Sequence, residues 1–306
     1  MPPLGRTGLD VFPICLGGNV FGWTADEAQS FEVLDAYVEA GGNFIDTANS
    51  YLVEHGRSET IIGRWMAERG NRDELVIATK VGGGKGPKRS LSRQTIEQEA
   101  QASLARLQTD RIDLYYAHFD DQDTPLEETL RAFDALVQAG TVRAIGASNY
   151  SPERLTEALE IQQLKGFAPF TALQPHYNLL ERDFERTMLP VADAWDLAVL
   201  PYYGLAKGFL TGKYRPGVDV GSARSRSASK YLADPANVQL LADLDAIAHG
   251  HGASVTAVSL AWLRAQRCIA APIASARTVE QLREMLPAAT LELSEQEMDR
   301  LSATTR

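Results

Sequence analysis

Short apolar runs alternate with longer amphipathic stretches along the whole chain. The runs lack strict alternation of polar and apolar residues, which is typical of strands buried on both faces. We therefore predict buried parallel strands joined by helices, the pattern of an α/β fold. The predicted strands are Phe12–Leu16, Phe44–Ile45, Leu75–Ala78, Ile112–Ala117, Val142–Ala147, Thr171–Leu173, Ala198–Pro201 and Cys268–Ile273.

The stretches between these runs have the spacing of helices that bury one face. In Glu27–Ala40, for example, Phe31, Leu34, Tyr37 and Val38 fall on one stripe. Three more predicted helices are Ser92–Leu107, Leu126–Ala139 and Pro152–Gln163. Three glycines that suit left-handed helix ends follow helical stretches: Gly70, Gly140 and Gly166.

About eight strand–helix units in a chain of 306 residues are what a (β/α)8 TIM barrel requires. We expect one such barrel as a single domain over residues 1–306. Leu4–Leu9, with two glycines, predicts an N-terminal β-hairpin at the barrel bottom, and Ser294–Leu301 predicts an extra C-terminal helix. The polar segment Tyr214–Lys230 departs from the pattern. We predict a mobile loop there at the ligand-binding end, with an insertion that has no role as the alternative.

The net charge of −10 disfavours nonspecific binding to nucleic acid, although a local basic pocket for a small anion is compatible with it. The N-terminus has no signal-peptide pattern, and no run approaches the ~20 apolar residues of a membrane-spanning helix. We therefore expect a cytoplasmic protein that makes no contact with membranes. Cys15 and Cys268 both lie in apolar settings, which predicts reduced core residues.

Four polar residues stand at the ends of consecutive predicted strands. Asp46 ends the second strand, Lys80 the third and His118 the fourth, while Tyr51 follows the second on a loop. The carboxyl ends of barrel strands converge on one mouth, so we expect these side chains to meet there. Each residue alone has an ordinary explanation, respectively a cap, a surface lysine, a neutral hydrogen-bonded ring and a packing aromatic.

Together the four residues suggest proton donation to a carbonyl. A free phenol, with a pKa of about 10, is a poor acid near neutral pH, and a nearby ammonium lowers that value. Lys80 would supply this charge, Asp46 would hold Lys80, and His118 would bind the developing alkoxide. A metal site is disfavoured because His118 has no histidine or cysteine partner at ligand spacing.

A hydride for such a reduction must come from a cofactor. The chain has no GxGxxG fingerprint, and the glycines of Val81–Gly86 lack the order of a P-loop. We interpret Val81–Gly86 as a flexible loop between a strand and a helix.

At these residues the chain resembles the aldo-keto reductases, and the resemblance runs nearly from end to end. NFIDTANSY, at 43–51, is similar to the family's first signature, and Lys80 in VIATK and His118 in YYAH match its lysine and histidine. IGASNYS at 145–151, LQPHYN at 173–178, PYYGLAKGFLTGKY at 201–214 and PIASARTVEQLREML at 272–286 resemble its cofactor segments.

The resemblance implies an extended NADPH bound without a Rossmann domain. Tyr51 would be the general acid in reduction and the base in the reverse reaction, within a tetrad with Asp46, Lys80 and His118. The cofactor-binding residues that it implies are Gly18, Asp46, Ser148, Asn149, Gln174, Tyr202, Leu205, Gly208, Leu210, Lys213, Ser275, Arg277, Gln281 and Glu284.

The family pattern also suggests individual roles for these residues. Ser148, Asn149 and Gln174 would hold the nicotinamide carboxamide, and Tyr202 would stack on the nicotinamide face. The segment from Leu205 to Lys213 would follow the pyrophosphate. At the adenosine end, Arg277 and Gln281 would contact the 2′-phosphate and Glu284 the adenine. A guanidinium matches a phosphate bidentately, so Arg277 favours NADPH over NADH.

The chain departs from the family at two places. Tyr203-Gly204 stands where the family has Ser-Pro, and Met285 stands where it has Asn. We expect the first change to alter pyrophosphate contacts or loop closure through a larger side chain and a freer backbone. The second should weaken cofactor affinity by removing one amide contact to adenine.

An aromatic rim suggests an apolar or ring-bearing carbonyl as the small-molecule substrate. The candidate pocket residues are Phe21, Trp23, Tyr51, Leu52, His118 and Phe119, together with His176 or Tyr177. The alternative function is a non-catalytic NADPH-binding, redox-sensing subunit resembling the potassium-channel β subunits. A hydrolase would need paired carboxylates or a metal cluster at the strand ends, and the sequence has neither. Both a monomer and a homo-oligomer are compatible with the sequence.

Overall fold

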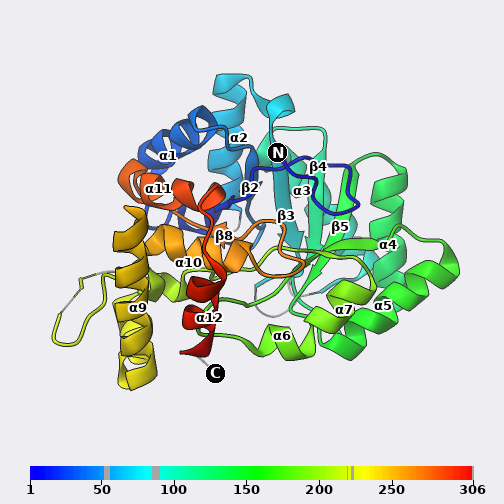
Figure 1. Ribbon diagram of the computed structural model, residues 1–306. Helices are drawn as coiled ribbons and strands as arrows, with labels where there is room; N and C mark the ends of the chain where they lie inside the picture. Colours follow the sequence, from blue (N-terminus) through cyan, green and yellow to red (C-terminus); the bar gives the residue numbers. More distant parts are fainter. Residues whose placement is uncertain (52–55, 85–89, 219, 222–223, 305–306) are drawn as a thin grey trace.

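The computed structural model describes residues 1–51, 56–84, 90–218, 220–221 and 224–304 (Figure 1). Its centre is an eight-stranded parallel sheet in the order β7-β6-β5-β4-β3-β2-β1-β8. The strands are β1 Cys15–Gly17, β2 Phe44–Asp46, β3 Val76–Val81, β4 Ile112–Ala117, β5 Val142–Ser148, β6 Phe170–Gln174, β7 Ala198–Val199 and β8 Ile273–Ala274.

The two edge strands meet, so the sheet closes into a barrel. Val199 of β7 donates from its backbone N–H to Cys268 O at 2.9 Å, and Ile273 of β8 donates to Pro201 O at 2.9 Å. Val199 also forms a parallel bridge with Ile269. The predicted (β/α)8 barrel is therefore confirmed.

Helices surround the sheet in Figure 1, and at least one helix follows every strand along the chain. Several N-termini are capped by side chains, for example those of Ser92 and Ser151, and the predicted glycines Gly70 and Gly166 end helices in the left-handed conformation. The helices are α1 Glu27–Glu39, α2 Arg57–Arg69, α3 Arg93–Leu107, α4 Leu126–Gln138, α5 Pro152–Lys165, α6 Asp183–Thr187, α7 Leu189–Ala194, α8 Ser225–Ala228, α9 Pro235–His251, α10 Val255–Arg264, α11 Val279–Met285 and α12 Glu295–Ala303.

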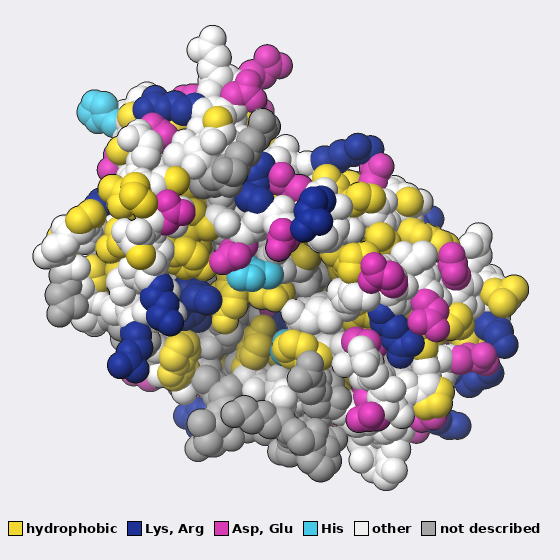
Figure 2. Space-filling view, turned by 90° about the horizontal axis from the view of Figure 1, so that it is seen from below, with side chains coloured by type: hydrophobic (Ala, Val, Ile, Leu, Met, Phe, Trp, Pro, Cys, Tyr) yellow, Lys and Arg dark blue, Asp and Glu magenta, His cyan; other side chains and the backbone are white. Residues whose placement is uncertain are grey.

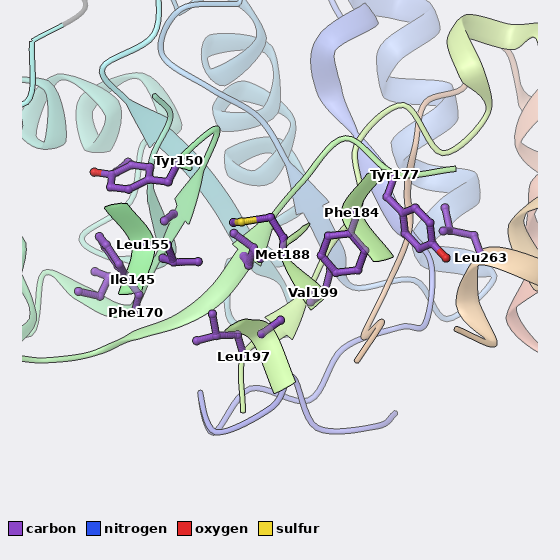
Figure 3. Packing of buried hydrophobic residues seen from close by; sticks show 14 of the residues in the cluster. Ile145, Tyr150, Leu155, Phe170, Tyr177, Phe184, Met188, Leu197, Val199 and Leu263 are labelled. Carbon is purple, nitrogen blue, oxygen red and sulfur yellow. The ribbon is translucent and has the colours of Figure 1, made fainter. Parts of the chain in front are cut away.

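Apolar side chains fill both the barrel interior and the layer between the sheet and the helices. In the outer layer, Ile145 of β5 and Phe170 of β6 lie beside Leu155 of α5 (Figure 3). Inside the barrel, the buried residues include Leu4 and Leu9 of the N-terminal segment. The Leu4 N–H donates to Leu9 O at 2.7 Å, so the predicted hairpin closes the barrel with its own apolar side chains.

The eighth predicted strand is too long in Cys268–Ile273, because only Ile273–Ala274 forms β8. Cys268 has a φ of 65°, in the left-handed region, which interrupts an extended strand. Its thiol is partly exposed and contacts Asp193, so the prediction of a core cysteine is wrong for Cys268 and right for buried Cys15. Both thiols are free.

The segment Tyr214–Lys230 is not a loop throughout. Tyr214 and Ala228 are buried, and α8 forms within the segment. These two side chains pack the segment against the barrel. The polar composition of the segment gave no sign of this packing. The mobility of the segment stays a prediction. No helix of the described part of the chain is long and apolar enough to span a bilayer.

Candidate active site

The four candidate catalytic residues reach one end of the barrel because their strands run parallel and in register. Asp46 is the last residue of β2 and pairs with Ala78 of β3, two positions before Lys80. His118 follows β4 directly, and its backbone N–H donates to Val81 O at 2.8 Å. Tyr51 lies on the loop after β2, and its side chain lines the same cavity as Asp46 and His118.

Lys80 is fully buried, and its ammonium has three acceptors. Nζ donates to Asp46 Oδ2 at 2.6 Å, to Thr47 O at 2.6 Å and to Tyr51 OH at 3.1 Å. Burial lowers the pKa of Lys80, but the charge of Asp46 and the contact with Tyr51 outweigh burial and raise it. Lys80 therefore stays a cation in a dry site, where an unpaired charge would be very unfavourable.

The Tyr51 hydroxyl holds its proton tightly. Burial is the largest influence on the pKa of Tyr51 and raises it. Lys80 lowers the pKa in part, and the net result is a pKa raised to about 12. Asp46 contributes to the rise through its negative charge. Lys80 thus lowers the pKa of Tyr51 as expected, but burial outweighs its effect, so the net shift is upward. Tyr51 is a protonated phenol at neutral pH, hydrogen-bonded to a cation that would stabilise its phenolate.

His118 is held from several sides at the barrel mouth. Its ring lies edge-on to Tyr51, with centroids 6.1 Å apart and planes at 78°. Phe119 stacks on it at 4.9 Å, and Ser50 Oγ lies 3.4 Å from Nδ1. The imidazole thus faces the same space as the phenol, where it can hydrogen-bond a substrate oxygen.

Gly83 is a site residue that the sequence interpretation of a merely flexible loop missed. A Cβ built on Gly83 would lie 2.2 Å from Ser50 Oγ and 2.4 Å from His118 Nδ1. Distances this short are forbidden, so only glycine lets the loop after β3 approach the histidine this closely. The run of three glycines was the available signal, but it does not say which ring lies against it.

Polar residues at the ends of β5 and β6 tie the tetrad to the next part of the barrel. Gln174 Nε2 donates to Asp46 Oδ1 at 2.9 Å, and Ser148 Oγ donates to Gln174 O at 2.8 Å. Asn149 Nδ2 donates to His118 O at 2.8 Å. Asp46 therefore has both carboxylate oxygens bonded, one to Lys80 and one to the amide.

A cavity of about 670 Å³ opens over these residues. Figure 2 shows a hollow near the middle of one face, where hydrophobic and histidine side chains lie beside a group of basic side chains. The predicted residues that line the cavity are Trp23, Asp46, Tyr51, His118, Phe119, Ser148, Asn149, Gln174, Tyr202, Leu205, Gly208, Lys213, Ser275, Arg277, Gln281 and Glu284.

Some predicted residues lie elsewhere. Phe21 is fully buried in the core, because the turn at Gly18–Val20 directs it inward. Leu210 is likewise a core residue, and Gly18 lies behind the cavity wall, where a Cβ would meet Ser58 Oγ at 2.9 Å. Tyr177 is buried against Phe184 of α6. Leu52 lies outside the described residues.

The departure at Gly204 has a packing reason. The φ of Gly204 is not positive, so this position does not need the conformational freedom of glycine that we expected. A Cβ on Gly204 would lie 3.2 Å from Leu263 Cδ2 and 3.4 Å from Ile273 O, so glycine lets the chain approach α10 and β8. The left-handed residue is Tyr203, with a φ of 54°.

The cavity suits an extended anion. Four basic side chains line its described wall: Lys207, Lys213, Arg224 and Arg277. Gly17 leaves room at Ser275, since a Cβ on it would lie 2.6 Å from Ser275 Oγ. The volume is in the range of cofactor sites. The residues at hand therefore fit a phosphate-bearing dinucleotide. In the described part of the chain, no three acidic, histidine or cysteine side chains gather as a metal site would require.

Comparisons with known proteins agree with this geometry. The model of the aldo/keto reductase family matches residues 13–306. An uncharacterized oxidoreductase, YrpG, of Bacillus subtilis is 36% identical over 96% of this chain and 92% of its own length. A norsolorinic acid reductase of Aspergillus flavus is 34% identical over 95% of this chain and 77% of its own. A putative aryl-alcohol dehydrogenase of Saccharomyces cerevisiae is 33% identical over 97% of this chain and 84% of its own length. This chain belongs to the aldo-keto reductase family.

Proposed function

We propose that this protein is an NADPH-dependent oxidoreductase that reduces aldehyde or ketone carbonyls to alcohols. The observation that carries the proposal is the buried Lys80, bonded at once to Asp46 and to the Tyr51 hydroxyl. The Tyr51 hydroxyl is thus a proton donor that already lies beside the ammonium that would stabilise its phenolate. The names of two relatives, a norsolorinic acid reductase and an aryl-alcohol dehydrogenase, support the same reaction class.

Bound NADPH supplies a hydride for the carbonyl carbon. The chain then has to deliver one proton to the carbonyl oxygen. Tyr51 donates that proton, and Lys80, 3.1 Å from its oxygen, stabilises the phenolate that is left. His118 donates a hydrogen bond to the substrate oxygen as negative charge develops there. Asp46 acts indirectly, by keeping Lys80 charged and in place.

At neutral pH the Tyr51 phenol, whose pKa is raised to about 12, is in the protonated form that reduction requires. Reduction starts from the protonated phenol, which is the resting form. Oxidation of an alcohol needs the phenolate as base, and this form is rare until the pH is high. We infer that Tyr51 acts chiefly as an acid.

The basic wall of the cavity supports NADPH rather than NADH. Arg277 and Lys213 both line the described wall, where their positive charges would attract phosphates. The Arg277 backbone N–H donates to Gln281 Oε1 at 3.0 Å, and the guanidinium of this cavity-lining residue would bind the 2′-phosphate.

The test is to incubate the purified protein with NADPH and a panel of aldehydes, ketones and quinones, and to follow the loss of NADPH absorbance. We expect oxidation of NADPH that depends on the carbonyl. Tight NADPH binding with no turnover on any carbonyl would overturn the enzyme proposal. That outcome would favour the redox-sensing subunit instead.

A further inference from the structure

The imidazole of His176 lies flat behind the ring of Tyr202. His176 follows β6 and forms a parallel bridge with Tyr202, which follows β7. The two rings are 5.3 Å apart between centroids, with only 10° between their planes. Tyr202 lines the described cavity wall and His176 does not, so the imidazole covers the face of Tyr202 turned toward the protein.

Further contacts hold the Tyr202 ring in this orientation. Its hydroxyl donates to Asn149 Oδ1 at 2.9 Å, and Asn149 in turn donates to the backbone of His118. The Tyr203 ring stands edge-on to both partners, at 5.5 Å and 70° to His176 and at 5.3 Å and 69° to Tyr202. Three rings thus make one packed unit beside the catalytic histidine.

The imidazole in this unit is uncharged. Its Nε2 is buried and has no hydrogen-bond partner among the described residues, a poor setting for a cation. Burial is the main influence that lowers the pKa of His176; Lys207 adds to the effect, and Glu181 opposes it. The other titratable groups that face it are the Tyr202 and Tyr203 phenols.

We propose that His176 is a positioning residue, a neutral ring that holds Tyr202 flat at the cavity wall where it meets the nicotinamide. The proposal rests on the proposed function, because it needs a nicotinamide in the cavity. A charged His176 would repel oxidised nicotinamide, which is itself a cation, and would leave the uncharged reduced form unaffected. Neutral His176 therefore lets the site hold both redox forms of the cofactor.

The first test measures dissociation constants of NADPH and of adenosine 2′,5′-bisphosphate, which lacks the nicotinamide. His176→Ala should raise the NADPH constant about fivefold or more, the scale of one aromatic contact. The bisphosphate constant should change less than about twofold. His176→Phe, which keeps a flat ring, should restore NADPH binding. His251→Ala serves as the control, because His251 lies at the end of α9 and bonds Glu297.

Two results would overturn the positioning role. One is unchanged NADPH binding by a folded His176→Ala. The other is an equal loss of NADPH and bisphosphate binding, which would indicate general damage to the site.

The second test uses pH. In the wild type, the ratio of the NADP+ constant to the NADPH constant should rise as the pH falls from about 7 to about 5, across the ordinary pKa of histidine and below it. The 2′-phosphate titrates near 6 in both forms, so its effect cancels in the ratio. In His176→Phe the rise should be clearly smaller than in the wild type, since His118 still lines the cavity, and an equal rise in that variant would overturn the proposal. Wild-type protein that binds NADPH but reduces no carbonyl would refute the proposed function alone, whereas failure to bind NADPH would refute both.

Discussion

Single residues at the barrel mouth show how burial and charge compete. Tyr51 sits 3.1 Å from a lysine ammonium, an arrangement that lowers a phenol's pKa. Burial nevertheless dominates and raises the pKa to about 12. Under the proposed function, Tyr51 would therefore donate its proton from the protonated resting form, and Lys80 would chiefly stabilise the phenolate left after donation.

Removal of the phenol oxygen should separate chemistry from binding. Tyr51→Phe should lower kcat by about 10²- to 10⁴-fold, the typical contribution of general acid catalysis. The dissociation constant of NADPH should stay within about twofold, because Lys80 keeps its bonds to Asp46 and Thr47. Stopped-flow turnover and fluorescence titration measure the two quantities. Tyr150→Phe is the control, since that buried hydroxyl has no partner among the described residues. Equal losses of turnover and binding would contradict the acid role.

The raised pKa of Tyr51 also predicts opposite pH profiles for the two directions. The protonated form predominates at every pH below about 12, so the reduction rate should stay flat between about pH 7 and about pH 9. The phenolate fraction grows about tenfold per pH unit in that range, and alcohol oxidation should rise with it. Initial rates in both directions at saturating cofactor test this. A reduction rate that falls steeply above pH 8 would argue against a phenol with so high a pKa.

At the scale of elements, loops place the side chains that the strands only bring near. The loop after β3 lies against His118 and Ser50 through Gly83, and the turn after β7 places Tyr203 with a positive φ. Gly83 contacts His118, which follows β4, and Tyr203 contacts His176, which follows β6, so each partner belongs to a different strand–helix unit. Local sequence marks such loops as glycine-rich but does not identify the partner.

A methyl group on Gly83 should disturb catalysis more than stability. Gly83→Ala would force the His118 ring or Ser50 to move, because its Cβ would lie 2.4 Å from Nδ1. We expect kcat/KM to fall about tenfold or more, since small misplacements of catalytic groups are costly. Gly250→Ala in α9 is the matched control, because no atom lies within 4 Å of the added carbon. Its free energy of unfolding should rise by ~0.5–1 kcal/mol, since glycine destabilises a helix relative to alanine. Unchanged kcat/KM for Gly83→Ala would contradict the idea that the close approach of Gly83 positions His118.

At the scale of the whole molecule, barrel closure brings the ends of the chain to one cavity. Trp23 and Arg277 both line it, although more than two hundred residues separate them. β1 pairs with both β2 and β8, so the first and last units become neighbours. The cavity, and with it any dinucleotide site, exists only when the barrel is closed.

Arg277 tests the adenosine end of this assembled site. Arg277→Ala should raise the KM for NADPH by about tenfold or more and leave that for NADH within about twofold, because only NADPH carries the 2′-phosphate. Arg283→Ala, in helix α11 just after Arg277 and outside the cavity lining, is the control. If both Michaelis constants shift alike in Arg277→Ala, a different residue binds the phosphate.

The sequence by itself determined the architecture and the membership of the tetrad. Periodicity and helix-ending glycines are local properties, and the apolar pattern predicted β4 at its observed bounds and α1 to within one residue. The strand-end positions of Asp46, Lys80 and His118 followed from the same pattern. Parallel register then makes their convergence a consequence of the fold.

Only the tertiary structure decided what depends on distance between remote segments. The sign of the Tyr51 pKa shift depends on burial by several loops, and the inward turn of Phe21 depends on the core it meets. The stacking of His176 on Tyr202 joins two different strand ends. Desolvation and ring packing are sums over neighbours that are far apart in the chain, so a linear pattern does not contain them.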